Sequence, residues 1–295
     1  QWIPELKNVK SSHLHKWYDY HTDYNLSDKK NNDKKDNDKK DNDKKNNKIT
    51  INYIKPIVDY TLEKEKNLKM YKTYVMHYKP LRDRKEFILK QLSSKGIENF
   101  EFITDFDKDV LTEKIIEDYY LEDEEKHFKE CQVSMRQGEK YQFQKMKYAS
   151  ISLCIKHVEA FEKTKQQEED FALFLEDDCR FHQDSTSLEE IISKAPQDWD
   201  AIVIGGPFKH DICQYNFIVG DDNSAYLKAK HPATNTTSSI LYRKSTAEKI
   251  MPYVKPFSLP IDWQLNFAFW KAKLNVYHIY PYISTQGDFK STAND

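Results

Sequence analysis

The sequence predicts a single α/β domain of three layers, in which helices cover both faces of a mixed, mostly parallel sheet. Apolar strand-like runs alternate with helix-like segments from about residue 70 onward, and this alternation is the pattern of βαβ units. The apolar runs are short and continuous, which is typical of strands buried on both faces. A chain of 295 residues is long enough for such a domain.

Five elements are expected in the first half of the domain. In chain order they are a strand at 73–78, a helix at 83–95, a strand at 100–103, a long helix that begins near Phe143, and a strand at 171–175. Gly96 follows the first helix, and glycine is common there because it adopts the left-handed conformation at little cost. Residues 107–140 are acidic and helix-prone without a clear apolar face, which predicts a surface excursion.

The second half continues the same alternation. A helix is expected to begin at the capping box Ser187-x-x-Glu190 and to end near Pro196, and a second helix to begin at the capping box Ser245-x-x-Glu248 and to end before Pro252. A third helix is expected from Asp262 to about Lys273. The expected strands are 201–204, 239–242 and 275–280. In α/β sheets, ligands bind beyond the carboxyl ends of the strands.

Residues 28–48 have the composition of a disordered linker. The segment holds nine Lys and six Asp among Asn, with no apolar side chain, so it cannot bury enough surface to offset the entropy cost of ordering. We therefore expect an N-terminal segment of unknown role at 1–27, the linker, and a single domain at 49–295 whose core covers about 72–292.

Composition excludes several functions. The six glycines form neither GxGxxG nor GxxxxGK[ST], so a Rossmann dinucleotide fingerprint and a P-loop are both excluded. The formal net charge of -2 provides no overall basic field, so we expect no nucleic-acid partner. No apolar run approaches the roughly 18 residues that span a bilayer, so no transmembrane segment is expected.

Four cysteines show no CxxC and no paired spacing, which argues against a zinc ribbon and a disulfide scaffold. This cysteine usage favours a reducing, cytoplasmic compartment. Because the sequence begins at Gln1 instead of Met, a signal upstream of it would instead direct the protein to the lumen of the secretory pathway. The sequence does not indicate an oligomeric state.

Three consecutive carboxylates, Glu176, Asp177 and Asp178, follow the strand at 171–175. Side chains two apart in an extended segment share a face, so Glu176 and Asp178 should converge while Asp177 points away. Adjacent carboxylates repel unless a cation neutralises them, and oxygen ligands suit Mn²⁺ or Mg²⁺. The pattern predicts a divalent metal on Glu176 and Asp178, and the alternative is a surface turn that caps the next helix.

An ordered set of motifs resembles glycosyltransferase family 25, the lipooligosaccharide galactosyltransferases and the related collagen galactosyltransferases. The matching segments are VMHYKPLRDR (75–84), SISLCIKHVEAFE (150–162), LEDD (175–178), WDAIVIGG (199–206), LPIDW (259–263) and YPYISTQ (280–286). The resemblance covers about residues 72–292 and implies a GT-A-type fold. It also implies a metal-dependent, inverting transfer of galactose or glucose from a UDP-sugar to an acceptor hydroxyl group.

The acceptor and the site residues are likewise expectations from this resemblance. EDDCRF at 176–181 is closer to the collagen-modifying members, which implies hydroxylysine or galactosylhydroxylysine of a collagen-like chain, or a glycan. Glu176 and Asp178 are expected to hold the metal, and Asp177 to contact ribose or to orient its neighbours. The residues expected at the donor are Arg84, His157, Gln286 and Ser291. Asp262 is expected to be the base that deprotonates the acceptor or a carboxylate that positions it, and the alternative is a helix N-cap.

Two positions depart from the family pattern. Lys156 stands where the family has Ser, and His77 stands where it has Asn, so the donor contacts made there do not carry over. His157 also has a packing interpretation, because a lone histidine on an apolar helix face is usually a core residue. The Asn-Thr-Thr segment at 235–237 reads as a surface feature.

Two other functions remain open at the level of sequence. The departures at Lys156 and His77 favour a catalytically degenerate transferase that serves as a binding module. A metal-dependent phosphohydrolase or nuclease could use the same carboxylates. Such an enzyme normally needs a second acidic or histidine cluster on a neighbouring strand, and the strand at 201–204 with the two glycines after it supplies none.

Overall fold

The structure, a computed structural model, describes residues 70–135, 140–206, 217–218, 225–230, 234 and 236–289. The segment expected at 1–27, the linker expected at 28–48 and Ser291 lie outside the described residues. Among the helices of the described ranges, none is long and apolar enough to cross a membrane.

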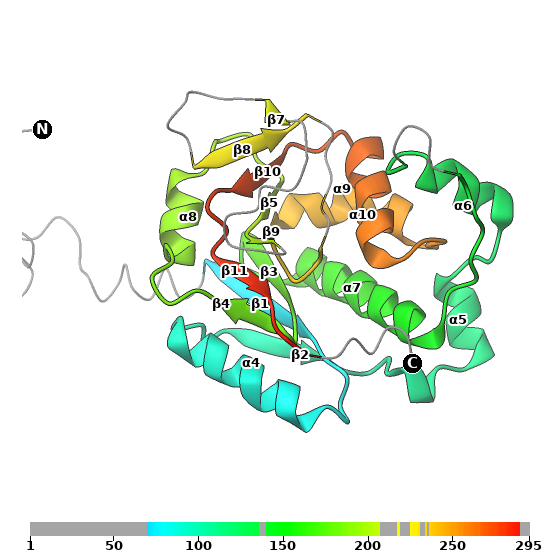
Figure 1. The fold of residues 1–295 in the computed structure, drawn as a ribbon, viewed down its shortest axis with the longest axis horizontal. Coiled ribbons are helices and arrows are strands. Elements are labelled where there is room, and N and C mark those ends of the chain that lie inside the picture. The colour runs from blue at the N-terminus through cyan, green and yellow to red at the C-terminus, as the bar shows by residue number, and fades with distance from the viewer. Residues whose placement is uncertain are drawn as a thin grey trace, which may run out of the picture. The chain divides into compact units, whose positions relative to one another are not determined.

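An eight-stranded mixed sheet with the order β2-β1-β3-β9-β5-β10-β8-β7 forms the centre of the fold (Figure 1). Its strands are β1 (Tyr71–Met76), β2 (Phe100–Ile103), β3 (Phe171–Glu176), β5 (Ala201–Val203), β7 (Phe217–Ile218), β8 (Tyr226–Ala229), β9 (Ser239–Arg243) and β10 (Val276–Ile279). A smaller sheet has the order β4-β11-β6 and consists of β4 (Cys179–Phe181), β6 (Gly205–Gly206) and β11 (Ser284–Gln286). The predicted α/β class with a mixed sheet is confirmed.

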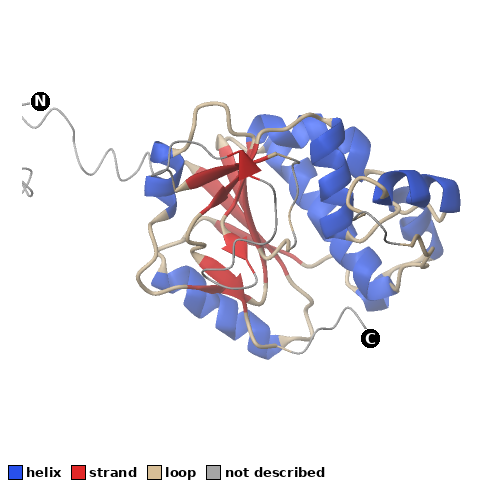
Figure 2. Ribbon diagram, turned by 45° about the horizontal axis from the view of Figure 1, so that its top comes forward, coloured by secondary structure: helices blue, strands red, loops and turns tan. Residues whose placement is uncertain are grey.

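Helices lie on both sides of the large sheet (Figure 2). On one side are α4 (Arg82–Ser94) and α8 (Leu188–Lys194). On the other side are α5 (Glu113–Tyr119), α6 (Glu124–Cys131), α7 (Tyr148–Gln166), α9 (Lys244–Val254) and α10 (Ile261–Lys271), and a short helical turn, η3 (Lys108–Val110), follows β2. The central helix α7 packs on β1 and β3 and against α9, and its buried apolar side chains join those of β3 in one core.

Six of the eight strands of the large sheet run in one direction, as predicted, and β8 and β9 run against them. β9 runs antiparallel to both β3 and β5, and β8 runs antiparallel to both β10 and β7. To form a parallel pair, the chain must cross over from the end of one strand back to the end of the sheet where that strand began. The chain instead begins β9 beside the carboxyl ends of β3 and β5, since Ser239 pairs with Leu175 and Ile240 with Val203. An apolar strand pattern carries no information about this direction.

Two helix boundaries also differ from prediction. The long helix begins at Tyr148 and not near Phe143. The helix α9 has no side-chain cap from Ser245 and continues through Pro252 to Val254. Proline within a helix removes one backbone hydrogen bond, but Val254 is fully buried in the core, and tertiary packing of that kind supplies most helical stability in proteins.

Three local signals do form the expected structures. Ser187 caps α8, where its hydroxyl accepts a hydrogen bond from the Glu190 N–H at 3.2 Å. Gly96 lies just beyond α4 with a φ of 64°, the left-handed conformation that glycine adopts without a Cβ penalty. The excursion predicted at 107–140 contains η3, α5 and α6, none of which belongs to the sheet.

Candidate functional site

A cavity lies at the carboxyl ends of β1 and β3. The two strands are parallel and in register, with Met76 opposite Glu176, so the residues that follow them, His77 and Asp177, also become neighbours. The cavity is lined by residues from β1 and the turn after it, from α4, from α7 and from the end of β3. They are Met76, His77, Tyr78, Leu81, Arg84, Lys108, Ala149, Ser152, Leu153, Lys156, Glu176, Asp177, Asp178 and Gln286.

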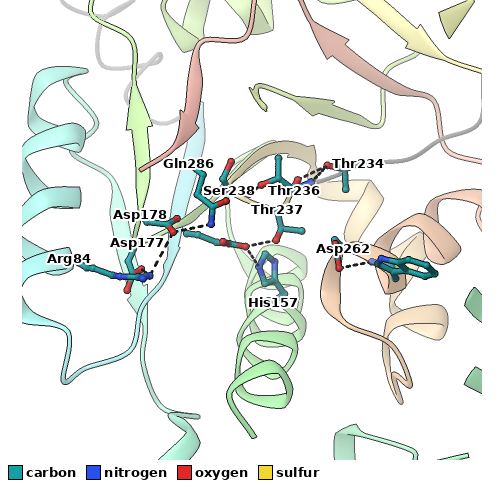
Figure 3. A network of polar contacts seen from close by, with 12 residues as sticks. Arg84, His157, Asp177, Asp178, Thr234, Thr236, Thr237, Ser238, Asp262 and Gln286 are labelled. Carbon is teal, nitrogen blue, oxygen red and sulfur yellow. Dashed lines mark hydrogen bonds and ion pairs between the residues drawn. The ribbon is translucent and has the colours of Figure 1, made fainter. Parts of the chain in front are cut away.

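Asp177 has both carboxylate oxygens engaged by protein groups. Its Oδ2 lies 2.8 Å from His77 Nδ1, and its Oδ1 accepts a hydrogen bond from Arg84 Nη1 at 3.0 Å. Figure 3 shows Arg84 beside Asp177. Because an ionised carboxylate only accepts hydrogen bonds, the proton shared with His77 lies on Nδ1. All three side chains are buried. This arrangement supports the interpretation that Asp177 orients its neighbours. The expectation that it points away from Glu176 and Asp178 is wrong, because β3 ends at Glu176 and all three carboxylates line the cavity.

Asp178 is held by a residue that is distant in sequence. Gln286 is paired with Cys179 across β11 and β4, and its Nε2 donates to Asp178 Oδ2 at 3.1 Å. The Gly287 N–H donates to the Asp178 backbone carbonyl at 2.7 Å, and a Cβ at Gly287 would lie only 2.8 Å from that oxygen. Asp178 Oδ1 is buried without a hydrogen-bond partner.

Glu176 ends β3 and accepts a hydrogen bond from the Thr237 hydroxyl. Burial, and after it the negative charge of Asp178, raises the pKa of Glu176. Burial also raises the pKa of Asp178, although Gln286 and Arg84 oppose this effect. The nearest approach of Arg84 to Asp178 is 3.7 Å, so the guanidinium is committed mainly to Asp177. Protein cations would therefore compensate the negative charge of ionised Glu176 and Asp178 only in part, and their raised pKa values favour the protonated forms while no cation is bound.

This pair fits a divalent cation. Two adjacent carboxyl groups with one unpartnered buried oxygen form an oxygen-rich position, and a hard cation would favour their ionised forms and bind to them. Within the ranges that the structure describes, no group of three or more His, Cys, Asp or Glu side chains is placed to hold a metal. The two carboxylates would thus share such an ion with oxygen atoms of a ligand and of water.

His157 lies beneath Glu176 and outside the cavity wall. Its Nε2 is 3.9 Å from Glu176 Oε1, which is too long for a hydrogen bond, and both ring nitrogens are buried without a partner. Burial lowers the pKa of His157 to about 3, so the imidazole is neutral near pH 7. Its ring packs near Phe174, with centroids 6.0 Å apart. The geometry favours the packing interpretation over a donor contact.

Asp262 lies on α10, apart from the residues that line the cavity. The alternative interpretation, that Asp262 is the N-cap of this helix, is wrong, because Pro260 occupies that position and Asp262 lies in the first turn. Its Oδ1 nevertheless accepts the Trp263 N–H at 3.0 Å, so the carboxylate contributes to the first turn of the helix. Burial raises the pKa of Asp262, and its charge contributes to the raised pKa of Glu176. Figure 3 shows it on the α10 side of His157.

Sequence reasoning missed two residues at this site. Thr237 is buried and bonded to Glu176, so the interpretation of 235–237 as a surface feature is wrong at this position. The run of four hydroxyl residues at 236–239, directly before β9, was the available signal. Lys156 is buried, lines the cavity, and donates to the His77 carbonyl and to Asp107 Oδ1, each at 2.5 Å. The two departures from the family pattern therefore contact each other.

Comparisons with known proteins do not add a function. No family model matches the chain, and no curated protein matches it. One of the solved structures that the chain matches is described as "Crystal Structure of A197 from STIV", with a TM-score of 0.39 and 11% identity over 75% of this chain and 86% of that chain. A likeness of this degree supports no inference about activity.

Proposed function

We propose that the protein is a metal-dependent glycosyltransferase of the GT-A type that moves a hexose from a UDP-sugar to an acceptor hydroxyl group with inversion. The observation that carries the proposal is the partly compensated pair Glu176 and Asp178 at the carboxyl end of β3, in a cavity. The family resemblance of the sequence supports the same reading, and the acceptor class, a collagen-like hydroxylysine or a glycan, rests on that resemblance alone.

Glu176 and Asp178 are the residues that would hold Mn²⁺ or Mg²⁺. Such an ion, when bound, stabilises the negative charge that develops on a departing diphosphate. The chain's own residues fix the position of these ligands, because Gln286 and Gly287 hold Asp178 and Thr237 holds Glu176. Asp177 keeps Arg84 and His77 in the cavity wall.

Asp262 is the proposed base. In the transfer, the acceptor oxygen forms a bond to the anomeric carbon while the bond from that carbon to the diphosphate oxygen breaks, and the hydroxyl proton passes to the Asp262 carboxylate. Burial raises the pKa of this group, which makes it a stronger base than an exposed aspartate. The bond from the Trp263 N–H to Oδ1 fixes the carboxylate without using Oδ2.

A panel of nucleotide sugars tests the donor, the metal and the reaction together. The proposal expects hydrolysis or transfer with a UDP-hexose in the presence of Mn²⁺ and its loss in EDTA. Asp262→Asn should retain donor binding and its melting temperature but transfer at least ~100-fold more slowly, the usual scale for loss of a general base. Normal turnover in Asp262→Asn removes this residue from catalysis. No activity with any donor and metal overturns the proposed function.

A further inference from the structure

The cavity contains a buried ammonium group that the proposed reaction does not use. Lys156 is 3% exposed and forms part of the cavity wall. It comes from the middle of α7, so a rigid element of the fold carries it. A lysine that served only to tie two elements together would have no need to reach the wall of a cavity.

Two contacts fix the direction of this side chain. Lys156 Nζ donates to the backbone carbonyl of His77 and to Asp107 Oδ1, both at 2.5 Å. Asp107 is itself held, since its Oδ2 accepts the Lys79 N–H at 3.1 Å. An ammonium group has three N–H donors, so one donor is left without a partner among the described residues. The contacts of Lys156 with the His77 carbonyl and with Asp107 thus hold its ammonium group at a fixed position in the cavity wall.

The charges around the cavity identify the kind of ligand that this donor suits. Asp177 is paired with Arg84, whereas Glu176 and Asp178 are bonded to the neutral groups of Thr237 and Gln286 and are the carboxylates suited to a cation. Asp107 pairs with the charge of Lys156, and the remaining N–H donor of this ammonium group is held at a fixed position in the cavity wall. Phosphate oxygens carry negative charge and accept strong hydrogen bonds from lysine.

We propose that Lys156 is a phosphate-recognition residue of the donor site, whose third N–H donates to a phosphate oxygen of the bound nucleotide. The inference rests on the proposed function, because it takes the ligand to be a nucleoside diphosphate sugar. It assigns a binding role to one of the two positions at which this chain departs from the family pattern. The alternative is a purely structural tie between α7, the end of β1 and the loop that contains Asp107.

Stepwise shortening of the ligand separates the two roles. The dissociation constants of UDP, UMP and uridine are measured at saturating Mn²⁺, by calorimetry and, for uridine, by competition. In Lys156→Met, UDP should bind roughly tenfold to hundredfold more weakly, which is the range for loss of a hydrogen bond to a charged group. Uridine, which has no phosphate, should bind the variant and the wild type within twofold of each other.

Matched variants control for loss of a buried ion pair. Outside the cavity, the half-exposed Lys249 forms an ion pair with the buried Asp200, with an N–O distance of 2.6 Å. Lys249→Met also removes the cation from a buried aspartate, so it should lower the melting temperature without changing UDP affinity. In the double variant Lys156→Met with Asp107→Asn, the aspartate no longer carries an unpaired buried charge. This double variant should recover stability but not phosphate affinity. It keeps the test decisive if Lys156→Met alone unfolds.

Each outcome decides the proposal. Equal losses for UDP, UMP and uridine, or no loss for any of them, overturn the phosphate role and leave the proposed function standing. A phosphate-dependent loss in a protein that transfers no sugar supports the phosphate role and overturns the transferase. If UDP, ADP, GDP and CDP all fail to bind the wild type, both proposals are overturned.

Discussion

The cavity has two adjacent polar regions that differ in how completely their charges are paired. In the first, which we call the paired region, Asp177 is bonded to His77 and Arg84, and Lys156 is bonded to Asp107. In the second, the carboxylate pair, Glu176 and Asp178 are partnered mainly by the neutral groups of Thr237 and Gln286. Asp177 of the paired region and the two carboxylates of the pair are consecutive residues at the end of β3. The two regions therefore differ mainly in whether a protein cation contacts the carboxylate.

This difference indicates which carboxylates the protein pairs with its own cations and which remain for a bound cation. A buried charge is tolerated when it is paired and hydrogen-bonded, and the paired region meets this condition within the protein. The carboxylate pair meets it only in part, and the raised pKa values of both groups express the remaining cost. The four predictions below test this contrast.

The largest effect is expected from Asp178→Asn, which removes one charge of the carboxylate pair. Mn²⁺-dependent turnover should fall by at least ~1000-fold, because loss of a metal ligand removes most of the charge stabilisation in such a site. The melting temperature should stay the same or rise, since a repulsion is lost. Mn²⁺ binding by electron paramagnetic resonance and thermal melting check both parts. Asp198→Asn, at a partly exposed aspartate outside the cavity, is the control, and wild-type turnover in Asp178→Asn contradicts the metal assignment.

The paired region should respond in the opposite way. Arg84→Met leaves Asp177 with only His77 as a partner, so the free energy of unfolding should fall by roughly 2 kcal/mol, the scale for loss of a hydrogen bond between charged groups. Mn²⁺ affinity should change much less than in Asp178→Asn. Urea denaturation and Mn²⁺ titration measure the two quantities. A variant that keeps full stability but loses Mn²⁺ would place Arg84 in the metal site and break the distinction between the regions.

The pH dependence of stability should expose the carboxylate pair without a substrate. Glu176 and Asp178 have raised pKa values in the folded protein, so the folded state binds more protons than the unfolded state. Their contribution to stability is complete below about pH 4, near the ordinary pKa of these groups, and is lost as the pH rises through the raised values. The increase in melting temperature on adding Mn²⁺ should therefore grow from pH 5 to pH 7.5. Glu176→Gln should show a smaller increase, and an increase that is independent of pH argues against the pair as the binding site.

The smallest effect is expected from His157→Leu, which tests whether His157 takes part in the site formed by Glu176 and Asp178. The imidazole is neutral, buried and without hydrogen bonds, so an apolar side chain of similar size should be tolerated. Turnover should change by less than about threefold, and the unfolding free energy by less than about 1.5 kcal/mol, the usual limit for a swap that conserves volume. Steady-state kinetics and urea denaturation provide the measurements. A loss of turnover at unchanged stability would make His157 part of the site.

Local signals in the sequence were sufficient for several parts of the fold. The strand 171–175 with its three following carboxylates, the cap at Ser187 and the glycine after α4 each depend on residues within a few positions of one another. Their physical causes, alternation along a strand, a side chain that accepts an N–H and the freedom of glycine at positive φ, act over short distances. The α/β class follows from the order of such elements.

The tertiary structure alone decided how the site is assembled. The in-register pairing of β1 with β3 places His77 against Asp177, and the pairing of β11 with β4 brings Gln286 to Asp178. The direction of β9 and the contact of Lys156 with His77 likewise depend on packing between segments about 60 to 80 residues apart. Strand direction, register and helix placement are set by long-range pairing, which a pattern of apolar residues does not specify, because the same pattern buries equally well in either direction. By itself, the sequence therefore determined which residues carry charge at the end of β3, and the fold determined which of those charges found a partner.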